Sequence, residues 1–111
     1  MSDRQITVGA AQFESRIGEV DANLELHLEW IARGREAGLD LLVCPELSLT
    51  GHHGTERLLE AAIRRTDPRL RRLAEATGGM ALVVGFIEEG PAAQFYNSAA
   101  ILKAGRMIHL H

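Results

Sequence analysis

The stretch LDLLVCPELSLTG, residues 39–51, decides the fold because an apolar run ends abruptly at a proline and a glutamate. The residues before Pro45 are apolar at consecutive positions, which is typical of a short strand buried within a parallel sheet. Pro45 has no amide hydrogen to donate, so we expect the strand to end there and Glu46 to enter the following loop. The stretch therefore predicts a buried parallel strand with a carboxylate at its carboxyl end.

The segments before this strand predict a strand, a helix and a crossover. Residues 5–13 carry apolar side chains in alternation, which predicts a first strand. Apolar residues at spacings of four and three from Leu24 to Ile31 predict an amphipathic helix. We expect Asp21 to be its N-cap and Gly38 to lie beyond its end. A strand, helix, strand unit of this kind forms a right-handed crossover between parallel strands.

Two further helix signals follow. Thr55 is a candidate N-cap for a helix that runs through Ile63. Asp67 is a candidate N-cap for a second helix, since Pro68 fits the first helical position and Gly78 stops the pattern.

The last third of the chain predicts three strands. Residues 80–89 form an apolar run of strand length. Residues 93–111 predict two strands joined at Lys103, Ala104 and Gly105, with glycine where a positive φ is needed. Together with the preceding segments, these strands indicate an α/β domain.

Length, composition and charge bound the function. With 111 residues, 46% hydrophobic and 24% charged, the chain has the size and composition of one globular domain. A formal charge of -3 argues against nucleic acid and an anionic membrane as partners. No apolar segment is long enough to span a bilayer, and one cysteine cannot form an internal disulfide. We expect a cytoplasmic protein with a small-molecule partner.

Glu46 is the candidate catalytic residue. It lies at the carboxyl end of a parallel strand, where open α/β sheets place their ligand crevice. Partial shielding from water would raise its pKa and suit it to general base catalysis. The alternative is a loop glutamate that is solvated or paired with an arginine, and the local pattern leaves both interpretations open.

Four segments in order resemble the amino-terminal part of the carbon-nitrogen hydrolase family, also called the nitrilase superfamily. They are ITVGAAQF, NLELHLEWIARGREAGLDLLVCPELSLTG, LRRLAEATGGMALVVGFIEE and FYNSAAILKAGRMI. The most specific piece is LLVCPELSLTG, which resembles the strand, proline, catalytic glutamate and Leu-Thr-Gly of that family. The resemblance implies a four-layer αββα sandwich, of which this chain would supply a mixed sheet with helices on one face.

The resemblance also implies a mechanism. The family hydrolyses amides or nitriles through a thioester, using a glutamate, a lysine and a cysteine in that order, with no metal and no organic cofactor. Glu46 matches the glutamate. The family lysine follows the final hairpin in an Arg-Lys pair and the cysteine comes much later, whereas this sequence reaches only His111. We therefore expect residues 1–111 to be a single partial domain, truncated before both, and inactive alone.

Neither Cys44 nor Lys103 matches the missing family residues. Cys44 stands where the family usually has an apolar residue, so we expect a small buried hydrophobe with a raised thiol pKa. In an extended segment it would share a face with Glu46 unless Pro45 breaks the alternation. Lys103 precedes the hairpin glycine, at a position the family leaves variable, and is expected to be exposed.

Partners and alternatives follow from the partial fold. An uncovered sheet face predicts self-association or a missing carboxyl-terminal segment. The alternative to an enzyme fragment is a non-catalytic α/β binding or interaction module that uses this face. His52 and His53 are candidates for the substrate entrance, although exposed loop histidines are the commoner case. Nitrilase, amidase, carbamoylase and glutaminase activities are not separated by the sequence.

Overall fold

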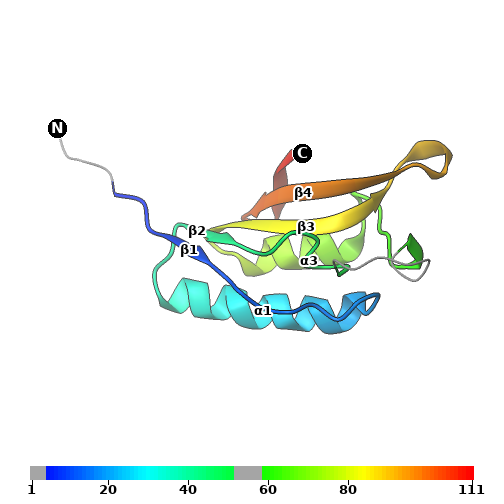
Figure 1. Cartoon of the computed structure of the whole chain (residues 1–111). Coiled ribbons are helices and arrows are strands. Elements are labelled where there is room, and N and C mark those ends of the chain that lie inside the picture. The colour runs from blue at the N-terminus through cyan, green and yellow to red at the C-terminus, as the bar shows by residue number, and fades with distance from the viewer. Residues whose placement is uncertain (1–4, 52–58) are drawn as a thin grey trace.

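A computed structural model of the chain describes residues 5–51 and 59–111 (Figure 1). Five strands form one sheet in the order β1-β2-β3-β4-β5. They are β1 (Val8–Ala10), β2 (Leu41–Val43), β3 (Ala81–Glu89), β4 (Phe95–Lys103) and β5 (Arg106–Leu110). Strands β1, β2 and β3 are parallel, whereas β4 and β5 extend the sheet in antiparallel pairs. The predicted mixed sheet is confirmed.

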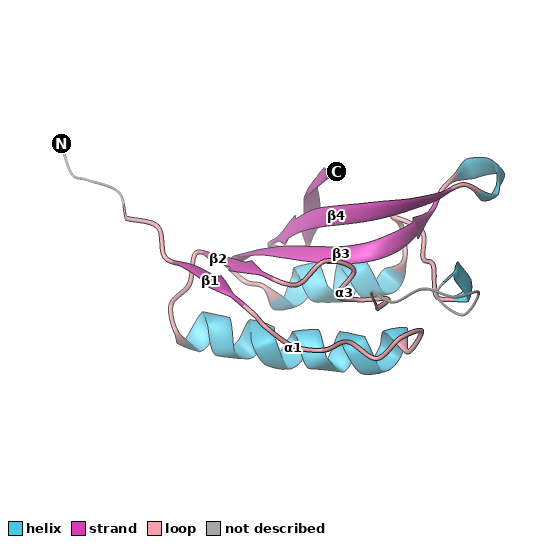
Figure 2. Cartoon of the chain, in the orientation of Figure 1, coloured by secondary structure: helices cyan, strands magenta, loops and turns pink. Residues whose placement is uncertain are grey.

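Two helices cover one face of this sheet (Figures 1 and 2). They are α1 (Val20–Glu36) and α3 (Pro68–Ala76), and a short 3-10 turn, η1 (Pro91–Ala93), connects β3 to β4. Over the described ranges no helix covers the opposite face. No helix in those ranges has both the length and the apolar character needed to cross a membrane.

Alternate residues of the central strands fill the core between the sheet and the helices. Leu82, Val84 and Phe86 of β3 are fully buried, and Ala100 and Leu102 of β4 lie beside them. Helix residues Ile31, Leu70 and Leu73 complete the same cluster. Because side chains alternate along a strand, the residues between them face the uncovered side of the sheet. On that side Val8 of the edge strand β1 is 57% exposed.

The two long helices begin differently. Asp67 is the N-cap of α3, as predicted, and its carboxylate accepts a hydrogen bond from the Arg69 N–H at 2.8 Å. Helix α1 has Glu19 at its N-cap, with no side-chain cap, and the prediction of Asp21 as the cap is wrong. Asp21 lies in the first turn and pairs with Arg69 at 2.7 Å. Its charge can favour the positive end of the helix dipole without a capping bond.

Two predicted elements differ from the structure in their bounds. The first strand is confined to Val8–Ala10, because it lies at the edge of the sheet and pairs only with the three residues of β2. The predicted helix ending at Ile63 does not reach that residue, and its proposed cap Thr55 lies outside the described residues. Ile63 instead forms a parallel bridge with Glu88, and its backbone bonds Ile87 and Glu89 at 3.0 and 2.9 Å. These sheet bonds require an extended backbone at Ile63.

Candidate active site

Glu46 lies in a tight turn directly after β2. The Ser48 N–H donates to the Pro45 carbonyl at 3.1 Å, and Leu47 has a positive φ of 51°. Such a backbone is uncommon for a residue with a side chain and must be held by its surroundings. The turn places Glu46 beyond the end of the strand, as the proline predicted, with its side chain exposed.

Asn97 of β4 reaches the same carboxylate from across the sheet. Its side-chain amide donates to Glu46 Oε1 at 3.2 Å. The neighbouring Ser98 is buried on the helix side, so Asn97 points to the uncovered face by strand alternation. Glu46 and Asn97 therefore meet on the face that lacks helices. The expected partial shielding of Glu46 is not found in this chain, because its side chain is exposed and no helix within the described residues covers that face.

The turn packs closely against β3 at Gly85. A Cβ at Gly85 would lie 2.5 Å from the Leu47 nitrogen, so only glycine allows this approach. The Leu49 N–H donates to the Gly85 carbonyl at 2.8 Å, and the Ile87 N–H donates to the Thr50 hydroxyl at 3.0 Å. The Thr50 hydroxyl thus takes the place of a backbone carbonyl as the partner of β3, beyond the point where Pro45 ends β2.

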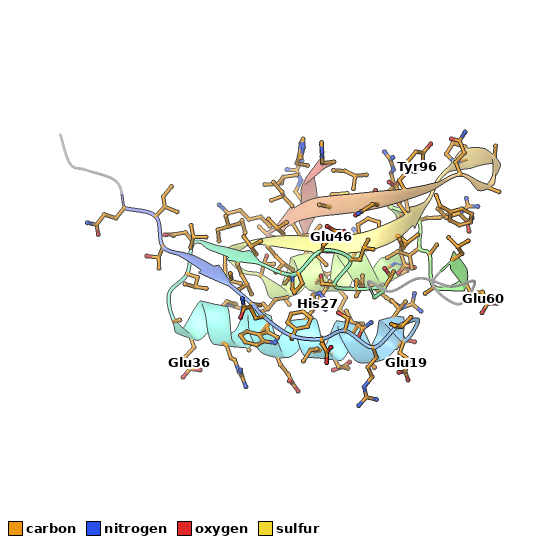
Figure 3. The ribbon with its side chains drawn as sticks, in the orientation of Figure 1. Glu19, His27, Glu36, Glu46, Glu60 and Tyr96 are labelled. Atoms are coloured by element: carbon orange, nitrogen blue, oxygen red, sulfur yellow. The ribbon has the colours of Figure 1, made fainter. Side chains whose placement is uncertain are left out.

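A buried polar layer lies beneath the turn, between α1 and the sheet (Figure 3). His27 is fully buried, and its Nε2 lies 2.8 Å from the Ser48 hydroxyl. The Asn23 side chain binds the Leu49 carbonyl at 2.9 Å and also both backbone groups of Arg16. These contacts tie the Glu46 turn to the first long helix.

Cys44 is buried in the main hydrophobic core and takes no part in the polar contacts around Glu46 that are described above. Desolvation by burial raises the pKa of its thiol to about 12. A thiol with this pKa is almost wholly protonated at neutral pH and is a poor nucleophile. The expectation of a small buried hydrophobe is confirmed. Glu46 is exposed instead, so the turn at Pro45 breaks the strand alternation.

Lys103 lies at the far end of the sheet from Glu46. It follows Asn97, the partner of Glu46, by six residues along the extended strand β4. At about 3.3 Å per residue, this places the two backbones roughly 20 Å apart. Lys103 is exposed, as expected, and cannot supply a positive charge beside the Glu46 carboxylate.

A cavity of about 330 Å³ opens beside Glu46. It is lined by Phe13, Glu14, Ser15, Ile17, Pro45, Glu46 and Leu47. The loop after β1 forms one wall, and its Phe13 packs edge-on against His27 at 5.2 Å between ring centroids. Over the described ranges, no three His, Cys, Asp or Glu side chains gather as a metal site. His52 and His53 lie outside the described residues, so their predicted place at the entrance is not seen.

Three polar residues of this region, Asn97, His27 and Ser48, were not predicted from the sequence to belong to the site. Asn97 belongs to the FYNSAA segment, where strand alternation puts it on the other face of the sheet from its neighbour Ser98, which is buried. His27 occupies the buried side of α1, four residues after Asn23, a spacing that aligns side chains on one helix face. Ser48 carries no local signal, since its contacts depend on the tertiary approach of α1 and β3.

This fold, with a glutamate after the second parallel strand, is similar to part of the nitrilase fold, and the chain belongs to the carbon-nitrogen hydrolase family. The model of that family, described as carbon-nitrogen hydrolase, matches residues 7–110. The family resemblance stated from the sequence is therefore confirmed.

Particular relatives fall into two kinds. A glutamine-dependent NAD(+) synthetase of Xanthomonas campestris is 32% identical over 104 residues, which cover 92% of this chain and 19% of the relative. The structure of a glutamine-dependent NAD+ synthetase from Acinetobacter baumannii matches 91% of this chain and 19% of its own, with 30% identity and a TM-score of 0.72. An amidase from Nesterenkonia sp. matches with 26% identity, a TM-score of 0.74, and coverage of 96% and 41%. The chain spans about a fifth of the synthetases' length.

Proposed function

We propose that this chain supplies the general base, Glu46, of a carbon-nitrogen hydrolase that acts on an amide. The single observation that carries the proposal is the Glu46 turn, which follows β2 and holds the carboxylate beside Asn97 and a cavity. The side-chain amide of glutamine is the first candidate substrate, because similar proteins are glutamine-dependent NAD synthetases and an amidase.

In this proposal the Glu46 carboxylate accepts the proton of a cysteine thiol. A thiol with an ordinary pKa of about 8.5 is mostly protonated at neutral pH, so it needs a nearby base to become a nucleophile. The thiolate attacks the amide carbon, the protonated Glu46 returns its proton to the leaving nitrogen so that ammonia departs, and water hydrolyses the resulting thioester. A lysine beside the reacting carbon stabilises the oxyanion. Glu46 supplies the first of these functions.

The direction of β5 would bring residues that followed it in a longer polypeptide toward the Glu46 end of the sheet. Ala99 and His111 exchange two backbone hydrogen bonds at 3.0 and 2.9 Å. In this antiparallel register, a residue two positions beyond His111 would lie opposite Asn97, which itself contacts Glu46. An Arg-Lys pair at that point of a longer polypeptide would bring its lysine to the Glu46 end of the sheet.

The isolated chain is proposed to be inactive, because its only lysine and its only cysteine are both misplaced for this mechanism. Lys103 lies at the wrong end of the sheet, and Cys44 is buried with a raised thiol pKa. The assay is ammonia release from glutamine and from simple aliphatic amides by purified residues 1–111. Turnover that disappears in Glu46→Gln would overturn this part of the proposal.

The role of Glu46 is tested in the polypeptide encoded by the complete reading frame. Glu46→Gln removes the base and should lower kcat for amide hydrolysis by at least about a hundredfold. The matched control is Glu75→Gln, which makes the same chemical change at an exposed position of α3. Full activity in Glu46→Gln would contradict the assignment, whereas a loss in both variants would point to a general defect.

A non-catalytic interaction module remains the second candidate, and the uncovered sheet face favours it. Val8 on that face is more than half exposed. In such a module Glu46 would serve only as a surface carboxylate, so Glu46→Gln would leave partner binding unchanged. The two candidates differ in whether a lysine and a cysteine follow residue 111.

A further inference from the structure

The Ser48 hydroxyl connects the Glu46 turn to both neighbouring elements. It accepts a hydrogen bond from the Gly85 N–H of β3 at 3.3 Å and lies 2.8 Å from Nε2 of His27 in α1. Ser48 is 1% exposed and His27 is fully buried, so water does not compete for either group. Because both groups are buried, each hydrogen bond of this hydroxyl is stronger than the same bond would be in water.

The direction of every proton in this network follows from its partners. His27 Nδ1 faces the Asn23 carbonyl, which can only accept, so Nδ1 carries the ring proton. Nε2 of the neutral ring is then an acceptor. The Ser48 oxygen accepts from Gly85, so its own proton is free to be donated to Nε2. One tautomer of a neutral His27 thus satisfies the whole chain of bonds.

We propose that His27, acting through Ser48, is a positioning residue for Glu46. The inference rests on the proposed role of Glu46 as the base. Glu46 and Leu47 are the central residues of the turn, and Leu47 holds an unfavourable positive φ. A turn of this kind persists only when its ends are fixed. Ser48 closes the turn with its backbone and anchors it with its side chain.

Loss of the anchor would release the turn at the point nearest the carboxylate. Without the Ser48 hydroxyl, the buried Nε2 of His27 and the Gly85 N–H would both lack partners, and the turn would shift to reach others. Such a shift would move the Glu46 carboxylate away from the Asn97 amide. A displacement of about 1 Å in a catalytic group can reduce a rate about a hundredfold.

The test compares Ser48→Ala with Thr77→Val. Thr77 is a matched control, because it is also fully buried, donates to one acceptor, the Ala74 carbonyl, and accepts one backbone N–H, that of Ala104. It lies after α3, far from the Glu46 turn. Both variants lose one buried hydroxyl with two bonds, so a general loss of stability is common to both.

The direct readout is NMR of the 111-residue chain. We expect Ser48→Ala to change the Asn97 side-chain amide resonances and the chemical shift of the Glu46 carboxyl carbon, and Thr77→Val to leave both as in the parent. Unchanged signals in Ser48→Ala, or equal changes in both variants, would overturn the proposal. If Ser48→Ala does not fold, the ¹⁵N chemical shifts of His27 in the parent chain provide the test. A ring protonated at Nδ1 is expected, and a ring protonated at Nε2 would overturn the proposal.

Kinetics in the complete polypeptide separate this inference from the proposed function. There we expect Ser48→Ala to lower kcat about a hundredfold with little change in KM, and Thr77→Val to retain kcat. If Glu46→Gln keeps full activity, the proposed function fails while the NMR result still stands. If Glu46→Gln is inactive but Ser48→Ala keeps its kcat, the positioning role alone fails.

Discussion

Cys44 and Glu46 stand two positions apart in the chain but lie in opposite environments. The thiol is in the core beneath the sheet, whereas the carboxylate is in a turn on the uncovered face. The difference arises at Pro45, which ends the ladder, and at Leu47, whose positive φ turns the backbone. The turn therefore leaves the Cys44 thiol buried and the Glu46 carboxylate exposed.

Cys44 should resist alkylation in the folded chain. A thiol pKa of about 12, in place of about 8.5 for an ordinary thiol, lowers the thiolate fraction at neutral pH by more than about a thousandfold. We expect iodoacetamide at pH 7.5 to modify Cys44 only at the rate of local opening, and to modify it quickly in urea. Rapid modification of the native chain, followed by mass spectrometry, would show that the thiol is accessible.

His27 should make stability depend on pH. Desolvation by burial lowers the pKa of His27 below its ordinary value of 6.5, although its bond to the Asn23 backbone opposes this. The unfolded chain therefore binds the proton more readily, so the contribution of His27 is complete above pH 6.5 and is lost as pH falls through the lower folded-state pKa.

The measurement is the free energy of unfolding in urea at pH 7.5 and pH 5.5. We expect the parent to lose more stability over this interval than His27→Gln, in which the other titrating groups are retained. Equal losses in the two proteins would mean that His27 is not held neutral by burial.

At the scale of elements, helix α3 follows its local signals and α1 does not. Asp67 and Pro68 fix the start of α3 as the sequence predicted. Helix α1 begins without a side-chain cap, because Asn23 in its first turn binds both backbone groups of Arg16 and holds the entering chain. Local patterns predict that these helices exist. They do not reveal the hydrogen bonds between Arg16 and Asn23, seven residues apart, that fix the start of α1.

Replacing the two aspartates at these helix starts should have unequal effects. Asp67→Ala removes the capping bond to the Arg69 N–H and should lower the free energy of unfolding by about 1 kcal/mol. Asp21→Ala is the control, because Asp21 also pairs with Arg69 but is 81% exposed and caps nothing. It should cost at most about 0.5 kcal/mol. Equal losses in urea unfolding would show that the ion pairs, not the cap, stabilise α3.

At the scale of the whole molecule, the strands that build the sheet were predictable, but the contacts that complete the site were not. Strand periodicity, turn residues and Pro45 predict β2 to β5 and the place of Glu46. The contact between Asn97 and Glu46 joins residues 51 positions apart, and it depends on strand order and register. Helical signals before Ile63 were overridden by sheet bonds at that residue.

The uncovered face should cause self-association of the isolated chain. Helices cover only one side of the sheet, and large apolar side chains such as Val8 and Phe95 are 57% and 41% exposed. We expect sedimentation at tens of micromolar to give a mass above 12.2 kDa, and Val8→Glu to shift it toward that value. A clean monomer for the parent would argue against an apolar face that needs a cover.

The nucleotide sequence directly downstream of the His111 codon tests the central claim most directly. If Glu46 is the base of a carbon-nitrogen hydrolase, the frame continues through an Arg-Lys pair within a few codons, at the Glu46 end of β5, and reaches a later cysteine. A stop codon after His111 would contradict this, and Glu46 would then be a surface carboxylate of a repurposed half-domain.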